Sequence, residues 1–149
     1  MSLIVVGVDG SERARAALRF ALEEGRLRGA TVRAVAAWHV PPAAYGGALA
    51  PPDPGFVNEL EPEARRTLER ALEQAGALAA DVEVETVVRE GAPARVLLDE
   101  AADADLLVVG SRGLGGFRGL LLGSVGQQCA HHAPCPLVIV PHARALAPD

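Results

Sequence analysis

The residues best placed to do chemistry form a glycine-rich segment in the last third of the chain. Nine residues separate Gly110-Ser111-Arg112-Gly113 from Gly123-Ser124, and more glycines lie between the two motifs. Because glycine has no side chain, backbone N–H groups can approach a ligand closely here. Ser124 and Gln127 predict a capping box at the start of a helix, whose N-terminus attracts anions. The segment therefore predicts a site for a phosphate chain, and hence for a nucleotide.

The charged residues limit how this site could hold phosphate. All 14 basic residues are arginine, so a Walker-type phosphate lysine and a Schiff-base lysine are excluded. Recognition must use backbone N–H groups, hydroxyls, arginine or a metal ion. Arg112 and Arg118 could each neutralise phosphate in a bidentate contact, or be solvated surface residues. Asp9 could bind a metal or orient a water, or be only the turn residue of Asp-Gly-Ser.

A second group of reactive side chains comprises Cys129, His131, His132 and Cys135. Cysteine and histidine are typical zinc ligands, but this spacing fits no standard zinc pattern. Cys129 and His132 lie one helical turn apart near a helix end, and Cys135 precedes an apolar strand. We therefore expect core packing and surface histidines here, and no metal site.

Strand-like and helix-like segments alternate along the chain and would position these residues. Apolar runs predict strands at Leu3–Val8, Thr31–Trp38, Val82–Val88, Asp105–Val109 and Pro136–Val140. Apolar residues at helical spacing predict helices from Ser11 to Gly25 or Gly29, over 60–75, from Pro93 onward, and from Ser124 to Ala133. Residues 39–56, rich in proline and glycine, predict a long loop.

This order of elements predicts a doubly wound α/β fold, a five-stranded parallel sheet with helices on both faces. In such Rossmann-like sheets the ligand lies beyond the C-terminal strand ends, where the winding direction reverses. Asp9 follows the first strand and Gly110 follows the fourth. If those two strands are neighbours, both motifs meet in one crevice.

Length and composition narrow the class of protein. The 149 residues are sufficient for one domain, predicted to span 1–149. A net charge of −5 without any basic run argues against a nucleic-acid partner. The N-terminal apolar run lacks a basic n-region and a cleavage site, and no apolar stretch has membrane-spanning length. With two cysteines, the chain is expected to be cytoplasmic, with no membrane partner.

Several motifs together resemble the universal stress protein family, in its ATP-binding branch. The family signature is Gly, two residues, Gly, nine residues, then Gly and Ser or Thr, and it is met by Gly110, Gly113, Gly123 and Ser124. Further matches are Val6-Gly7-Val8-Asp9-Gly10-Ser11, His39-Val40, Gly91-Ala92-Pro93 and Cys135-Pro136-Leu137-Val138-Ile139-Val140. The resemblance covers nearly the whole chain and implies a fold like that of the adenine nucleotide α-hydrolases.

The resemblance also implies which residues would hold ATP, with Mg²⁺ expected because the phosphate charges meet no lysine. Gly7 and Asp9 would lie near the adenosine, the backbone around Val40 would read the adenine edge, and Val109 and Gly110 would flank the ribose. The phosphates would be held by Gly113, Leu114, Gly115, Gly116, Gly123, Ser124 and Val125. The predicted site also includes Ser111 and Arg112, although Arg112 and Arg118 depart from many members of the family. A homodimer through the last strand, Leu137–Val140, is implied as well, since this apolar edge would otherwise be exposed.

The expected function is that of a cytoplasmic ATP-binding stress-response or regulatory protein. Nucleotide occupancy would act as a switch that alters a surface read by an unidentified protein partner. The alternative is a slow ATP hydrolase or nucleotide-hydrolase-like enzyme that uses Asp9, although such enzymes need a Ser-Gly-Gly-x-Asp-Ser loop where this chain has Val-Asp-Gly-Ser. A nucleotide-free interaction module is a third reading, against which the intact Gly123-Ser124 motif argues.

Overall fold

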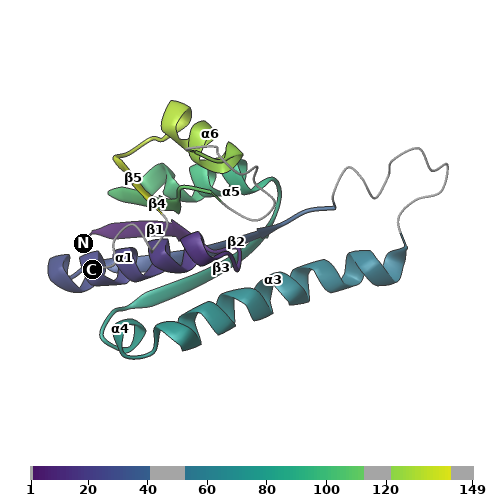
Figure 1. Cartoon of the computed structure of the whole chain (residues 1–149), viewed down its shortest axis with the longest axis horizontal. Helices are drawn as coiled ribbons and strands as arrows, with labels where there is room; N and C mark the ends of the chain where they lie inside the picture. The colour runs from purple at the N-terminus through teal and green to yellow at the C-terminus, as the bar shows by residue number, and fades with distance from the viewer. Residues whose placement is uncertain (1, 41–52, 113–121, 142–149) are drawn as a thin grey trace.

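The computed structural model describes residues 2–40, 53–112 and 122–141. Its centre is a five-stranded sheet of order β3-β2-β1-β4-β5, in which every neighbouring pair is parallel (Figure 1). The strands are β1 (Leu3–Gly7), β2 (Thr31–Trp38), β3 (Val84–Glu90), β4 (Leu106–Gly110) and β5 (Leu137–Val140). The predicted parallel α/β sheet is confirmed.

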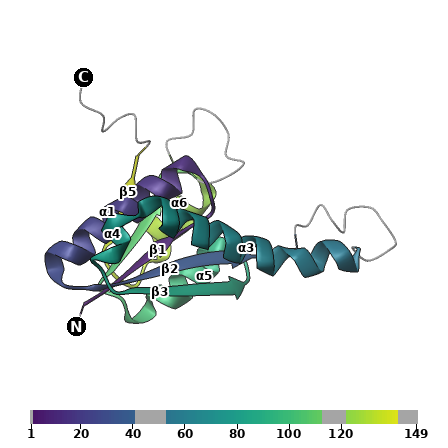
Figure 2. The same ribbon diagram turned by 90° about the horizontal axis from the view of Figure 1, so that it is seen from below.

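Helices cover both faces of the sheet, as the sequence predicts (Figures 1 and 2). They are α1 (Glu12–Arg28), α3 (Pro54–Ala75), the short α4 (Ala77–Ala80), α5 (Pro93–Glu100) and α6 (Ser124–His132). A 3₁₀ turn at Ala101–Asp103 follows α5. Successive strand residues point to opposite faces. Ile4 and Val6 therefore pack under α1 and α3, while Val5 packs under α5 and α6.

The sequence of α1 explains both of its ends. The Ser11 hydroxyl accepts a hydrogen bond from the Ala14 N–H at 3.2 Å, as expected of an N-cap. At the other end Gly29 adopts a left-handed conformation, with φ 64°, which ends the helix. Gly25 does not mark the helix end, because it is buried inside α1. A Cβ there would lie 2.7 Å from Val32 Cγ2, so this glycine allows close packing on β2.

Two elements begin two or more residues away from their predicted start, and β3 also ends at Glu90 rather than Val88. Helix α3 begins at Pro54, inside the predicted loop 39–56, because Asp53 accepts a hydrogen bond from the Gly55 N–H and Pro54 occupies a favoured first-turn position. The rest of that loop, from 41 to 52, lies outside the described residues. Strand β3 begins at Val84 rather than Val82, because the Val82 N–H is still bonded to the Ala79 carbonyl after α4.

Helix α3 reaches well beyond the sheet at its N-terminal end (Figures 1 and 2). Its 22 residues bury only Leu68 and Ala71, both in the half that lies against the sheet. The first turns carry Phe56, whose side chain is exposed. No helix of the described residues is long and apolar enough to cross a membrane.

Candidate functional site

The candidate site lies at the edge of the sheet where the winding direction reverses. Strands β1 and β4 are parallel neighbours, with Ile4 opposite Leu106, so their C-terminal ends reach the same edge. The chain leaves β1 for α1 on one face and leaves β4 for α6 on the other. The condition set by the sequence, that these two strands be neighbours, is met. Asp9 and Gly110 thus follow adjacent strand ends.

Gly110 determines how closely α1 approaches β4. A Cβ at this position would lie 2.9 Å from the backbone carbon and oxygen of Arg13. Backbone atoms have no rotamer with which to yield, so only glycine fits without a shift of the helix. The N-terminal turn of α1 therefore rests directly on the end of β4.

The turn between β1 and α1 is built by its own polar groups. The Asp9 carboxylate is exposed and accepts a hydrogen bond from the Ser11 N–H at 2.9 Å. Gly10 has φ 83°, a conformation that glycine adopts readily. Asp9 thus serves as the turn residue of Asp-Gly-Ser, one of the two roles its sequence allowed. Gly7 packs under α5, where a Cβ would lie 2.9 Å from Leu97 Cδ1.

The two ends of the glycine-rich segment meet beside β5. The Ser111 N–H donates to the Val140 carbonyl at 2.8 Å, and the Ser111 carbonyl accepts from the Gly123 N–H at 2.6 Å. These bonds place the start of α6 next to the end of β4. Gly113, Leu114, Gly115 and Gly116, with Arg118, lie outside the described residues.

The predicted capping box at Ser124 and Gln127 is wrong. Gly123 is the N-cap of α6, with extended backbone and no side-chain cap, and Ser124 is the first helical residue. The Ser124 hydroxyl lies 3.4 Å from Gln128 Nε2, and Gln127 donates instead to the Leu122 carbonyl. With no described side chain capping it, the N-terminus of α6 presents N–H groups that an anion can accept from.

The other predicted site residues differ in the solvent exposure of their side chains. Val109 is 3% exposed and belongs to the core under α5 and α6, against which Val125 also packs. Only the backbone of Val109 could therefore face a ligand. Val40 follows β2 at the same edge of the sheet and is half-buried. Arg112 lies against Gly123: the Arg112 Cα is 3.1 Å from the position that a Cβ on Gly123 would occupy.

The cysteine and histidine group forms part of the core and the surface, as expected. Cys129 is fully buried, and burial raises the pKa of its thiol to about 11. Burial, with a smaller contribution from the Asp105 carboxylate, also raises the pKa of the Cys135 thiol. His131 and His132 are exposed at the end of α6.

Arg13, in the first turn of α1, was not predicted as a candidate from the sequence. Its Nε is buried, with no hydrogen-bond partner in the described structure. A sequence signal was present, because a cation in the first turn of a helix opposes the helix dipole.

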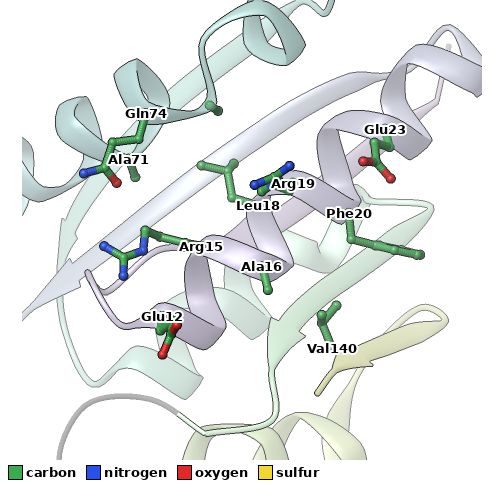
Figure 3. Close-up of a pocket in the computed structure, with 11 residues that line it drawn as sticks. Glu12, Arg15, Ala16, Leu18, Arg19, Phe20, Glu23, Ala71, Gln74 and Val140 are labelled. Atoms are coloured by element: carbon green, nitrogen blue, oxygen red, sulfur yellow. The ribbon is translucent and has the colours of Figure 1, made fainter. Parts of the chain in front are cut away.

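An open groove of about 800 Å³ runs along the outer side of α1 (Figure 3). It extends from Ala71 and Gln74 of α3 to Val140 at the end of β5. Ala16 and Phe20 line it on the side of α1 that faces Val140.

The family profile and the similar sequences all point to the same protein family. The profile described as "Universal stress protein family" matches residues 1–141. A universal stress protein of Mycobacterium tuberculosis is 34% identical over 97% of this chain, which spans 49% of that relative. A universal stress protein of Thermus aquaticus is 34% identical over 92% of this chain and 96% of its own length. The chain thus spans about half the length of its mycobacterial relatives and nearly all of the Thermus protein.

Solved structures agree with this comparison. A universal stress protein in complex with cAMP superposes with a TM-score of 0.67, at 27% identity, covering 95% of this chain and 97% of that one. A universal stress protein of Archaeoglobus fulgidus in complex with dAMP gives a TM-score of 0.63 at 27% identity, covering 94% and 98%.

Proposed function

The chain belongs to the universal stress protein family, and we propose that it binds an adenine nucleotide, ATP, at the reversal point between β1 and β4. The observation that carries this proposal is that the end of β4, where Gly110 admits α1, lies next to the N-terminus of α6. Gly110 lets α1 rest on β4, and α6 begins beside it at Gly123, where no side chain of the described residues caps the helix. Such a helix N-terminus favours phosphate.

Relatives of similar fold support the choice of an adenine nucleotide. Two of them, each 27% identical to this chain, were solved with cAMP and with dAMP. We extend this ligand class to ATP because the glycine segment between Gly110 and Ser124 is long enough to surround several phosphates. In this proposal Gly7, Asp9, Val40 and Val109 lie toward the nucleoside.

The charge of the phosphates needs a counterion. The chain has no lysine, so Mg²⁺ would share the neutralisation with Arg112 and with backbone N–H groups. Carboxylates are the protein ligands that Mg²⁺ prefers, and Asp9 supplies one at this edge of the sheet.

We propose a regulatory rather than an enzymatic role. Residues 1–149 form one domain that acts in the cytoplasm, where nucleotide occupancy changes the surface presented to a protein partner. The helix N-terminus and the glycine segment hold bound ATP nearly as well as its transition state, which gives affinity without acceleration.

A homodimer completes the proposed assembly. In the described structure, no strand pairs with the outer edge of β5, Leu137–Val140, and an apolar edge strand invites pairing. Ala16 and Phe20 flank this edge in the groove of Figure 3. Antiparallel pairing with a second copy would cover both the edge and this flank about a two-fold axis.

The direct test is to identify and measure the nucleotide. Mass spectrometry of the small molecules released from denatured, purified protein should find an adenine nucleotide. Calorimetry with ATP, ADP, AMP and cAMP, each with and without Mg²⁺, should then rank ATP with Mg²⁺ first. The absence of binding for all four would refute the proposal.

A matched pair of variants places the site. Ser124→Ala removes an exposed hydroxyl from the start of α6, so ATP affinity should fall about tenfold, the effect of one hydrogen bond to a charged group. Gln128→Ala, one turn further along the same helix, removes the side chain that contacts this hydroxyl and should leave the affinity unchanged. Equal affinities in both variants would move the phosphates away from α6.

A further inference from the structure

Arg13 occupies a position where arginine is unfavourable in the ligand-free protein. Ser11 caps α1, so Arg13 lies at the second helical position, in its first turn. The positive end of the helix dipole repels a cation there, and acidic residues are the favoured occupants. The residue before it, Glu12, follows this preference. Arg13 does not.

Its hydrogen bonding is unfavourable too. Arg13 Nε is buried and lacks a hydrogen-bond partner among the described residues. A buried unsatisfied donor costs about 1–3 kcal/mol, and more when the group is charged. One guanidinium thus carries two independent penalties.

The backbone contact at Gly110 fixes where these penalties arise. The Cβ of Arg13, like its backbone carbon and oxygen, lies 2.9 Å from the position of a Cβ on Gly110, so this side chain starts at the edge of the sheet where the proposed phosphate segment begins. An anion at this edge would remove both penalties at once, by accepting from Nε and by compensating the cation. Residues that break local rules without visible compensation are expected at functional sites.

We propose that the guanidinium of Arg13 binds a phosphate group of the nucleotide, and so takes the part that lysine takes in other phosphate sites. This inference rests on the proposed function, because it names a further phosphate contact of that site. Arginine suits the task since its fork donates two parallel hydrogen bonds to phosphate oxygens.

The test compares ligands that differ in phosphate number. Arg13→Met keeps an unbranched, apolar side chain beside Gly110 and removes the charge and the donors. ATP affinity, measured by calorimetry, should fall about ten- to a hundredfold, while adenosine affinity stays the same. Arg15→Met, an exposed arginine on the same helix, should leave both affinities unchanged.

A second measurement separates binding from folding. Without ligand, Arg13→Met should melt at the same temperature as the unsubstituted protein or higher, because two penalties are removed. Tripolyphosphate should raise the melting temperature of the unsubstituted protein but not that of Arg13→Met.

Each outcome has a distinct meaning. Equal ATP affinity in Arg13→Met, or equal losses for ATP and adenosine, would overturn the assignment of Arg13 and leave the proposed function standing. A lower melting temperature without ligand would show a structural role instead. Failure of the unsubstituted protein to bind any adenine nucleotide would overturn the proposed function and this inference together.

Discussion

Gly110 and the backbone of Arg13 determine the distance between the end of β4 and the first turn of α1. Gly110→Ala should destabilise the protein by about 1–3 kcal/mol, since the new methyl group would lie 2.9 Å from the Arg13 carbonyl carbon and oxygen. Urea unfolding measures this loss. Gly55→Ala is the control, because the nearest atoms to its Cβ would be those of the Asp53 carboxylate, at 3.4 Å or more, in the first turn of a helix. Its stability should stay constant or rise by up to about 1 kcal/mol. Equal effects would contradict the packing argument.

Cys129 should make the protein less stable at alkaline pH. Burial raises its folded-state pKa to about 11, above the value of 9.0 expected for the unfolded thiol. The unfolded state therefore loses its proton first, and stability falls as pH rises through this interval. Urea unfolding between about pH 8 and about pH 10.5 should show this slope, and Cys129→Ala should reduce it. The partly buried Cys135, replaced by alanine, is the control that should keep most of the slope. A slope that survives in Cys129→Ala would place its cause elsewhere.

The two halves of helix α3 differ in how they pack. Its C-terminal half buries Leu68 and Ala71, whereas its N-terminal half extends past the sheet and contains Pro62. A proline inside a helix removes one backbone hydrogen bond and clashes with the preceding turn. Pro62→Ala should therefore slow hydrogen exchange over 54–64 while the midpoint of global unfolding changes little. Pro54→Ala should give no such protection, because proline is favoured at the first helical position. Unchanged exchange in Pro62→Ala would show that the proline does not limit this half.

The elements were predictable where a local pattern decides them. Thr31–Trp38 is the observed strand, and Ser11 caps α1 as its type and position predict. The N-cap of α6 was not predictable in this way. Ser124 and Gln127 match the capping-box pattern, but in the structure Gly123 is the N-cap. A pattern of residue types does not contain the tertiary bond from Gly123 to Ser111 that fixes this geometry.

The candidate site shows the same division. Topology brings Asp9 and Gly110 to one edge, as the order of elements predicted. The sequence did not distinguish a glycine that leaves room for a ligand from one that allows a neighbouring helix or strand to pack closely. Gly7 packs against Leu97 and Gly25 against Val32, and only the fold reveals these contacts. The sequence also did not reveal that Arg13 Nε is buried.

At the scale of the whole molecule, the two edge strands of the sheet, β3 and β5, differ in charge. Strand β3 carries Glu85, Arg89 and Glu90, and Glu85 is bonded to Arg33 of β2 at 2.9 Å. Charged residues on an edge strand discourage pairing with another chain. Strand β5 reads Leu-Val-Ile-Val, with no charge. A symmetric dimer is therefore expected at β5 and not at β3.

The hydrogen bonds of β5 show which of its backbone groups would form that dimer. The Pro136 carbonyl accepts from Leu107 and the Val140 carbonyl from Ser111, so the groups facing β4 alternate along β5. Leu137 and Ile139 consequently present their N–H and C=O groups to the outer edge. An antiparallel partner strand would bond to these residues.

Ile139→Pro should therefore convert the dimer to a folded monomer. It removes a donor that faces the partner and leaves the ladder to β4 intact, because proline is tolerated on an edge strand whose N–H points outward. Light scattering measures the mass, and circular dichroism confirms the fold. Ile139→Ala is the matched control: it trims the side chain that packs under α6, keeps the N–H, and should remain dimeric. A dimer that persists in folded Ile139→Pro would move the interface away from β5. A monomer at every concentration of the unsubstituted protein would refute the dimer itself.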